Sequence, residues 1–233
     1  NYFQSSVIDF DKDRSDRSTY KLLGGSIGFY GSTLNTRQYA TKGYLEKLIA
    51  QVFTGRERFE PGNPQEGYSP SPQERQSWLQ ISYMKEAYHT MGPKFTLGWM
   101  AEALYSSKNF SENYTATMMQ AGEFAPTPHS KLMYNEAFRA NQYVAAGIKP
   151  IYVLNDMFQF RTEFYGFTPI FPIKKNALNK AYYGKAFSRF EYMGEVSVIC
   201  HLPFGAISAY VNHYSSPRRE WNVGLSIGFQ LFN

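Results

Sequence analysis

Residues 221–231 read Trp-Asn-Val-Gly-Leu-Ser-Ile-Gly-Phe-Gln-Leu, so that every odd position is large and apolar and every even position is small or polar. Successive side chains of a β-strand point to opposite faces of the sheet. In a transmembrane β-barrel one face of each strand meets lipid and the other faces a wet lumen. The alternation therefore predicts a membrane-spanning strand at 221–231.

Other segments of the chain repeat this alternation. In the segment that starts at Phe158, phenylalanines alternate with Gln159, Arg161 and Glu163, which places the charges on one face and the aromatic rings on the other. The alternation of apolar and polar residues is clear in segments 79–87, 95–105, 158–164 and 190–204. Weaker candidates are 2–10, 19–30, 44–59, 141–154 and 206–215. Together these segments predict about ten strands.

The connections between the strands alternate in length. Short links are expected at 90–94, 155–156 and 203–205, and long ones at 61–77, 107–140 and 171–186. Outer-membrane barrels have short periplasmic turns and longer extracellular loops, and this rhythm fits them. The link 31–43 fits poorly, because it should be a periplasmic turn and yet is not tight.

These features predict an all-β fold, namely a transmembrane antiparallel β-barrel of about ten strands. Residues 1–233 are expected to form a single outer-membrane domain with both termini periplasmic. An open sheet edge in the hydrocarbon leaves backbone groups unpaired at high cost, so the sheet must close. Either about ten strands close on themselves, or they are the last strands of a larger barrel.

The composition excludes several other classes. Aromatic residues make up 18% of the 233 residues, charged residues also make up 18%, and no run of about eighteen apolar residues exists, which excludes a helical membrane protein. The Lys and Arg residues behind the net charge of +5 are scattered, so no nucleic-acid partner is predicted. The single Cys200 excludes an internal disulfide and a Cys-rich zinc site, and no cofactor is expected.

The link 107–140 is the most unusual segment. It contains Pro126-Thr127-Pro128-His129-Ser130 and Asn135-Glu136-Ala137-Phe138-Arg139, and it is rich in aromatic residues and Met. Loops this long are functional or disordered, and this composition favours packing, either as a surface lid or inside the lumen. Its candidate functional residues are His129, Ser130, Asn135, Glu136 and Arg139. Metal-ligand spacing around His129 is missing, so no metal is predicted.

Six charged residues are expected to face the lumen, namely Glu102, Arg161, Glu163, Arg189, Glu191 and Glu195. A structural ladder of charges is the first interpretation of this set, and an ion-selectivity filter is the second.

Two kinds of motif suggest catalysis. The hydrolase pattern G-x-S-x-G occurs at 24–28 and 224–228, but a nucleophile elbow requires a strand-to-helix turn, and both stretches lie inside alternating strands. His213 and Ser215 share a strand face, where the imidazole could act as a base toward the hydroxyl, as in outer-membrane phospholipase A. The rest of that family's pattern is missing. A histidine in the interfacial belt is the first interpretation, and a catalytic pair is the alternative.

Several blocks of sequence resemble the C-terminal barrel of patatin-like phospholipases of Bacteroidetes-type bacteria, which is similar to the bacterial surface-antigen type. The blocks are 23–31, 33–39, 126–131, 135–142 and 220–224. The resemblance runs over nearly the whole chain and implies a patatin hydrolase domain upstream with a Ser-Asp dyad. No catalytic residue carries over to this chain, because the Asp-Gly-Gly or Asp-Gly-Ala motif of that dyad is absent here.

The leading functional hypothesis is a non-catalytic barrel that anchors the upstream lipase and helps to present or translocate it. A barrel phospholipase using His213 and Ser215 and a passive pore gated by 107–140 are the alternatives. The expected partners are outer-membrane lipid and lipopolysaccharide, the barrel-assembly machinery, and further copies or other outer-membrane proteins. The first residues show no signal-peptide pattern, so a processed chain or part of a longer polypeptide is expected.

Overall fold

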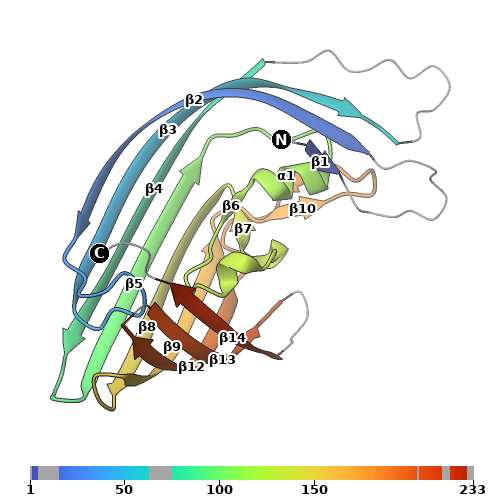
Figure 1. Cartoon of the computed structure of the whole chain (residues 1–233). Helices are drawn as coiled ribbons and strands as arrows, with labels where there is room; N and C mark the ends of the chain where they lie inside the picture. The colour runs from blue at the N-terminus through green and yellow to red at the C-terminus, as the bar shows by residue number, and fades with distance from the viewer. Residues whose placement is uncertain (1, 5–15, 63–74, 204, 217–220, 230–233) are drawn as a thin grey trace, which may run out of the picture.

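A computed structural model describes residues 2–4, 16–62, 75–203, 205–216 and 221–229. They form a ten-stranded antiparallel sheet in which strands adjacent in the sequence also pair in space (Figure 1). Its strands are β1 (Tyr2–Gln4), β2 (Arg17–Ser32), β3 (Gly43–Glu60), β4 (Arg75–Thr90), β5 (Phe95–Ser106), β8 (Gln142–Val153), β9 (Phe158–Pro169), β12 (Glu191–Leu202), β13 (Gly205–Tyr214) and β14 (Trp221–Phe229).

The prediction of an all-β antiparallel sheet is confirmed. The period-two segments mark strand positions closely: β5 starts at Phe95, β9 at Phe158 and β14 at Trp221. Strands β2 to β4 extend a few residues beyond the predicted bounds. Residues 5–10 and 230–231, which belong to the first and last predicted strands, lie outside the described residues.

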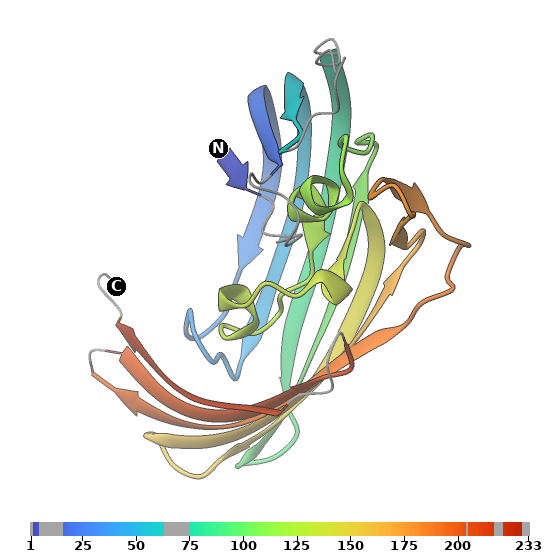
Figure 2. The ribbon, with the colours of Figure 1, turned by 90° about the vertical axis from the view of Figure 1, so that its right-hand side faces the viewer.

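The sheet is strongly curved and open. Within the described ranges β14 pairs with β13 alone, and Figure 2 shows its edge well away from β1 and β2. The ten described strands therefore do not close on themselves. This leaves a concave face, which the rest of the chain covers in part, and a convex face.

The convex face is apolar. Residues paired across antiparallel strands share a face, so the register assigns the sides. Exposed convex side chains include Leu23, Ile27, Leu48, Val52, Ile81, Tyr105, Val144, Ile148, Phe160, Phe164, Val196, Val211, Val223, Leu225 and Ile227. This apolar band runs from β2 to β14.

The long connections contain structure that the sequence did not predict. In the loop 107–140 lie α1 (Tyr114–Gln120), β6 (Gly122–Glu123), the 3-10 turns Ser130–Leu132 and Glu136–Phe138, and β7 (Arg139–Ala140). β10 (Ile173–Lys175) and β11 (Ala181–Tyr183) form a hairpin in the link 171–186. Asn113 caps α1 by accepting a hydrogen bond from the Ala116 amide. No helix in the described residues is long and apolar enough to span a membrane.

The hydrophobic core lies between the loop 107–140 and the concave face. Phe124 and Phe138 of the loop are 1% exposed and pack on Tyr143, Phe167 and Met193 of the sheet. The Phe124 and Phe167 rings stack with centroids 5.9 Å apart. Fully burying such a ring stabilises the folded state by about 1.5–3 kcal/mol. Of the two positions expected for this loop, the structure shows the one inside the curve of the sheet (Figure 2).

Candidate functional site

The loop 107–140 is fastened to the sheet through His129. Its Nδ1 atom lies 2.9 Å from a carboxylate oxygen of Glu195 on β12, and its ring stacks on Tyr210 of β13 with centroids 3.4 Å apart. The other ring nitrogen is 3.5 Å from the Ser208 hydroxyl. His129, Glu195 and Ser208 are all buried. Because both ring nitrogens and one face of the imidazole make contacts, His129 fixes the tip of the loop against the concave face of the sheet.

A tight local turn presents His129. The Thr127 amide donates to the Ser130 hydroxyl at 3.0 Å, and the Ser130 amide donates to the Thr127 hydroxyl at 3.1 Å. The Ser130 hydroxyl in turn donates to the Thr127 carbonyl at 2.9 Å. These reciprocal bonds satisfy the buried polar groups of the turn. The structure therefore gives Ser130 a role in shaping the turn that carries His129.

The other loop candidates also make specific bonds. Arg139 pairs with Glu123 at 2.7 Å and donates to the Met119 and Ala121 carbonyls at the end of α1, where a cation is favourable. The Asn135 amide donates to the Ser216 carbonyl at 3.1 Å. Glu136 accepts a hydrogen bond from the Tyr114 hydroxyl. These contacts hold the loop together and tie it to the β13–β14 connection.

A buried charge network lines the centre of the concave face. Arg161 pairs with Glu163 at 3.0 Å on β9, and Lys149 of β8 pairs with Glu86 of β4 at 2.8 Å. The Tyr165 hydroxyl donates to Glu163 at 2.5 Å. Buried charges are stable only when they are paired, and these two acids and two bases balance. Lys149 and Glu86 are not among the six charged residues expected to face the lumen, although the alternation of their strands marks both as inward residues.

The other residues expected to face the lumen also lie on the side of the sheet that the loop covers. Glu102 accepts a hydrogen bond from Tyr143 at 2.5 Å. Arg189 pairs with Glu191 at 2.8 Å and donates to the Ala137 carbonyl of the loop at 3.0 Å. The Arg189 contact connects the sheet end to the loop, and the Glu102 contact joins β5 to β8.

The turn between β2 and β3, residues 33–42, folds onto the concave face, a position that its sequence does not predict. The Tyr39 hydroxyl donates to Ser208 of β13 at 2.8 Å, and Gln159 of β9 donates to the Tyr39 carbonyl at 3.2 Å. Arg161 donates to the buried Ala40 carbonyl at 2.9 Å. The poor fit of link 31–43 to a tight turn was the signal that pointed here.

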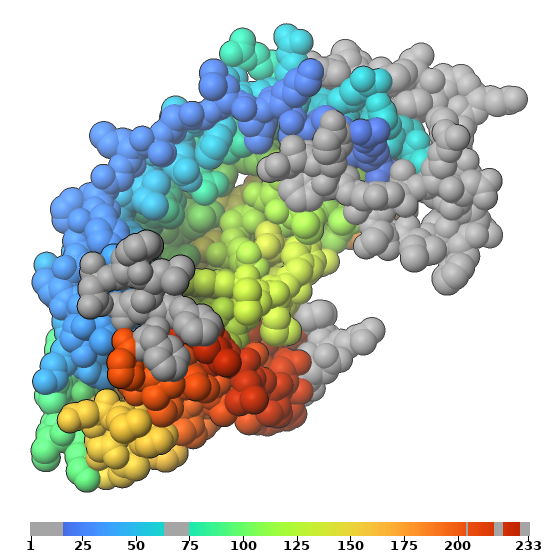
Figure 3. Space-filling model, viewed as in Figure 1, coloured from blue at the N-terminus to red at the C-terminus, as the bar shows by residue number. Residues whose placement is uncertain are grey.

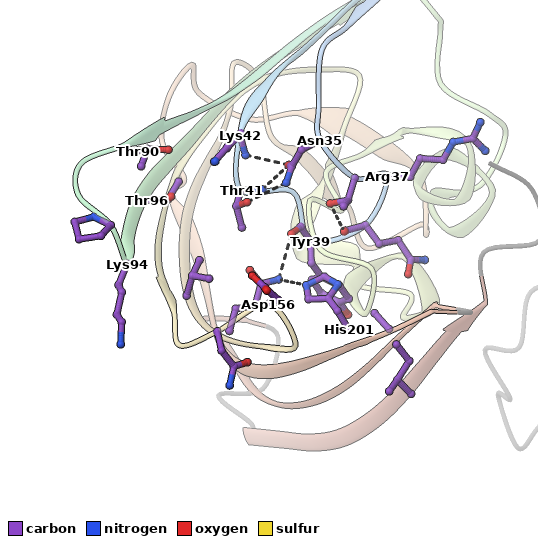
Figure 4. A pocket seen from close by; sticks show the side chains of 18 of the residues that line it. Asn35, Arg37, Tyr39, Thr41, Lys42, Thr90, Lys94, Thr96, Asp156 and His201 are labelled. Atoms are coloured by element: carbon purple, nitrogen blue, oxygen red, sulfur yellow. Dashed lines mark hydrogen bonds between the residues drawn. The ribbon is translucent and has the colours of Figure 1, made fainter.

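Two cavities lie on either side of this turn. One, of about 1050 Å³, opens among the short turns and is lined by Lys42, Lys94, Asp156 and His201 (Figure 4). The other, of about 1110 Å³, lies between the turn and the loop 107–140, and its lining includes Glu102. Residues 35–39 line both cavities.

The structure does not bring His213 and Ser215 together as a catalytic pair. His213 lies on the convex face between the rings of Tyr192 and Trp221. The Ser215 hydroxyl donates to Glu191 and accepts from the Tyr192 amide. Its proton therefore points to a carboxylate, and no hydrogen bond between His213 and Ser215 is present in the described structure.

The hydroxyl of Ser208, the imidazole of His129 and the carboxylate of Glu195 lie next to one another in the spatial order of a hydrolase triad. Their surroundings, however, are those of a contact that only holds the loop on the sheet. Ser208 is 1% exposed, accepts a hydrogen bond from Tyr39 and lines neither cavity, so an acyl group has no room beside it. Within the described ranges, no group of three or more His, Cys, Asp or Glu side chains is arranged to hold a metal. Comparisons with protein-family models, curated proteins and solved structures found no match to this chain.

Proposed function

We propose that this chain forms part of the wall of an outer-membrane β-barrel. The observation that carries the proposal is the inverted polarity of the sheet. Its outward side exposes a continuous apolar band, whereas Arg161, Glu163 and Lys149 are buried on its inner side. Soluble proteins rarely expose apolar patches larger than a few hundred Å². Lipid is the surrounding that makes such a band favourable.

The strand lengths and connections support this assignment. Strands β5, β8, β9 and β12 have twelve residues each, and a tilted membrane-spanning strand needs about 9–11. The short turns lie at one end of the sheet and the long loops at the other (Figure 1). In this proposal the short turns and the end of β14 are periplasmic and the long loops face outward, whereas Tyr2, expected at the periplasmic end, pairs with Thr19 at the loop end of β2.

We further propose that the barrel anchors a patatin-like lipase domain and helps to present or translocate it. The support is the resemblance of the loop blocks 126–131 and 135–142 to the barrels of such lipases. In the structure both blocks hold the loop on the sheet, because they contain the anchor residue His129 and the core residue Phe138. The catalytic residues would then belong to the upstream domain, and this chain would supply the membrane attachment.

Membrane extraction tests the barrel. The full-length protein should stay in the membrane pellet after alkaline carbonate washing, require detergent for purification and migrate differently on gels before and after heating. A chain that is soluble and monodisperse without detergent would refute the proposal. Lipase activity that sediments with the outer membrane, and becomes soluble when residues 1–233 are deleted, would support the anchoring role. Soluble lipase activity in the intact protein would contradict it.

A further inference from the structure

The turn 33–42 crosses the interior rather than merely linking β2 to β3. Its Tyr39 and Ala40 make hydrogen bonds to β9 and β13, which are four and six strands from β3 in the sheet order. Tyr39 also has a backbone φ of 55°, an unusual value for a residue other than glycine. Strained backbone of this kind persists only where the surroundings hold it, and it is concentrated at functional sites and switches.

The interior beside β2 to β4 is hollow. The loop 107–140 packs against β5 to β13, whereas Leu22 and Tyr30 on the inner face of β2 stay exposed. Figure 3 shows the hollow between the β2–β4 wall and the loop. The two cavities lie along this hollow, and the turn lies between them. The turn is thus the partition between the end with the short turns and the inner space.

The linings of both cavities carry an excess of positive charge. Arg37 lines both of them, Lys42 and Lys94 line the outer one, and Lys47 and Lys131 line the inner one. The inner bases Lys149 and Arg161 are already neutralised by Glu86 and Glu163. The acids that remain in the linings are Asp156 and Glu102. A polar passage with excess cationic side chains favours anions.

We propose that the turn 33–42 is a gate across a passage for small anions, held shut by Tyr39. This inference rests on the proposed barrel. In the closed state the Tyr39 hydroxyl is bonded to Ser208, and Gln159 and Arg161 hold the backbone of the turn. Release of these bonds lets the turn swing back toward its own strands and joins the two cavities. The gate is therefore separate from the loop 107–140.

Single-channel recording of the full-length protein in planar bilayers tests this. The parent should be closed nearly all the time. Tyr39→Gly removes the ring and the hydroxyl while tolerating the positive φ, and it should raise the open probability at least about tenfold. The matched control is Phe187→Gly, since Phe187 is also an aromatic residue at positive φ (51°) but lies in a loop at the other end of the sheet. It should behave as the parent.

A crosslink provides the reverse experiment. A Cβ atom on Gly228 would meet the side chain of Gln38, so Gln38→Cys and Gly228→Cys place two thiols together in a Cys200→Ser background. A short cleavable thiol crosslinker should silence the openings of Tyr39→Gly, and reduction should restore them. In a salt gradient the reversal potential should show anion preference, and Arg37→Glu combined with Lys42→Glu should weaken or invert it.

The outcomes separate this inference from the proposed function. A protein that fails to insert into membranes refutes the barrel and the gate together. A protein that inserts but whose Tyr39→Gly variant conducts no more than the parent refutes the gate alone. So does a parent that is freely open, a crosslink without effect on Tyr39→Gly, or a preference for cations.

Discussion

The imidazole of His129 and the carboxylate of Glu195 meet at 2.9 Å although 66 residues separate them in the chain. Both side chains are nearly fully enclosed, at 2% and 4% exposure. A contact of this kind fixes a loop tip to a sheet more firmly than an exposed pair, which contributes little. The loop 107–140 is therefore a fixed part of the interior, and the stability of the domain should depend on this contact.

Replacing Glu195 by Ala should detach the loop tip. It leaves the buried His129 without its strongest partner, and we expect a loss of about 1.5–3 kcal/mol in the free energy of unfolding. Denaturant titration in detergent measures the loss, and limited proteolysis should show faster cleavage near residue 129. The control is Glu112→Gln, since Glu112 pairs with Lys180 at 3.7 Å on the surface and should change stability little. Equal effects of the two variants would contradict the anchor.

An arginine introduced on the convex face should destabilise the folded protein only if lipid contacts that face. Leu225 at the middle of β14 and Leu178 in the β10–β11 hairpin are both 79% exposed. In water, Leu→Arg would be tolerated equally at both positions. In a membrane, Leu225→Arg should cost about 2–4 kcal/mol and Leu178→Arg close to nothing. Folding titrations into lipid vesicles measure the difference, and two equal values would contradict membrane contact at β14.

Gly147 should tolerate no side chain. A Cβ atom there would lie 2.1 Å from the Tyr165 ring, which is fully buried and bonded to Glu163. Gly147→Ala should destabilise the fold by about 1–3 kcal/mol, because the core must be overpacked. Gly25→Ala on β2, where a Cβ meets nothing within 4 Å, should be neutral or slightly stabilising. Thermal unfolding of both variants checks that Gly147→Ala is the less stable of the two. Equal stabilities would indicate a loosely packed interior.

The stability should rise with pH through the titration of Lys108. Burial lowers the pKa of Lys108 in the loop to about 8, and Glu57 opposes this shift. The ammonium group also lies 5.0 Å from the centre of the Trp78 ring. Between about pH 8 and the ordinary lysine pKa, the unfolded chain holds a proton that the folded chain has lost, so stability increases across this window. Below about pH 8 both states are protonated and the contribution is flat.

The measurement for Lys108 is the denaturation midpoint at about pH 7.5 and about pH 10. Lys108→Met has no group to titrate at this position and should lack the part of the rise that Lys108 contributes. Identical pH profiles for the parent and Lys108→Met would show that the folded environment leaves this lysine unperturbed.

The strand positions and the two faces of the sheet were predictable from the sequence. Alternation is a local property of the chain, since each residue of a strand points opposite to the next. Residues 221–231 therefore placed Leu225 outward and Ser226 inward before any pairing was known, and Arg161 and Glu163 were recognised as inward charges. The length of the link 31–43 also marked an irregular turn.

The contacts across the interior were decided by the tertiary structure. Tyr39 reaches Ser208 over 169 residues and His129 reaches Glu195 because the sheet curves and two connections fold back into its hollow. No periodicity encodes how far a sheet curves or which loop enters it, and the packing of rings such as Phe124 and Phe138 decides both. Whether the sheet closes into a barrel is likewise decided by the tertiary structure. The alternation requires a covered inner face, but the ten described strands curve without their two edges meeting.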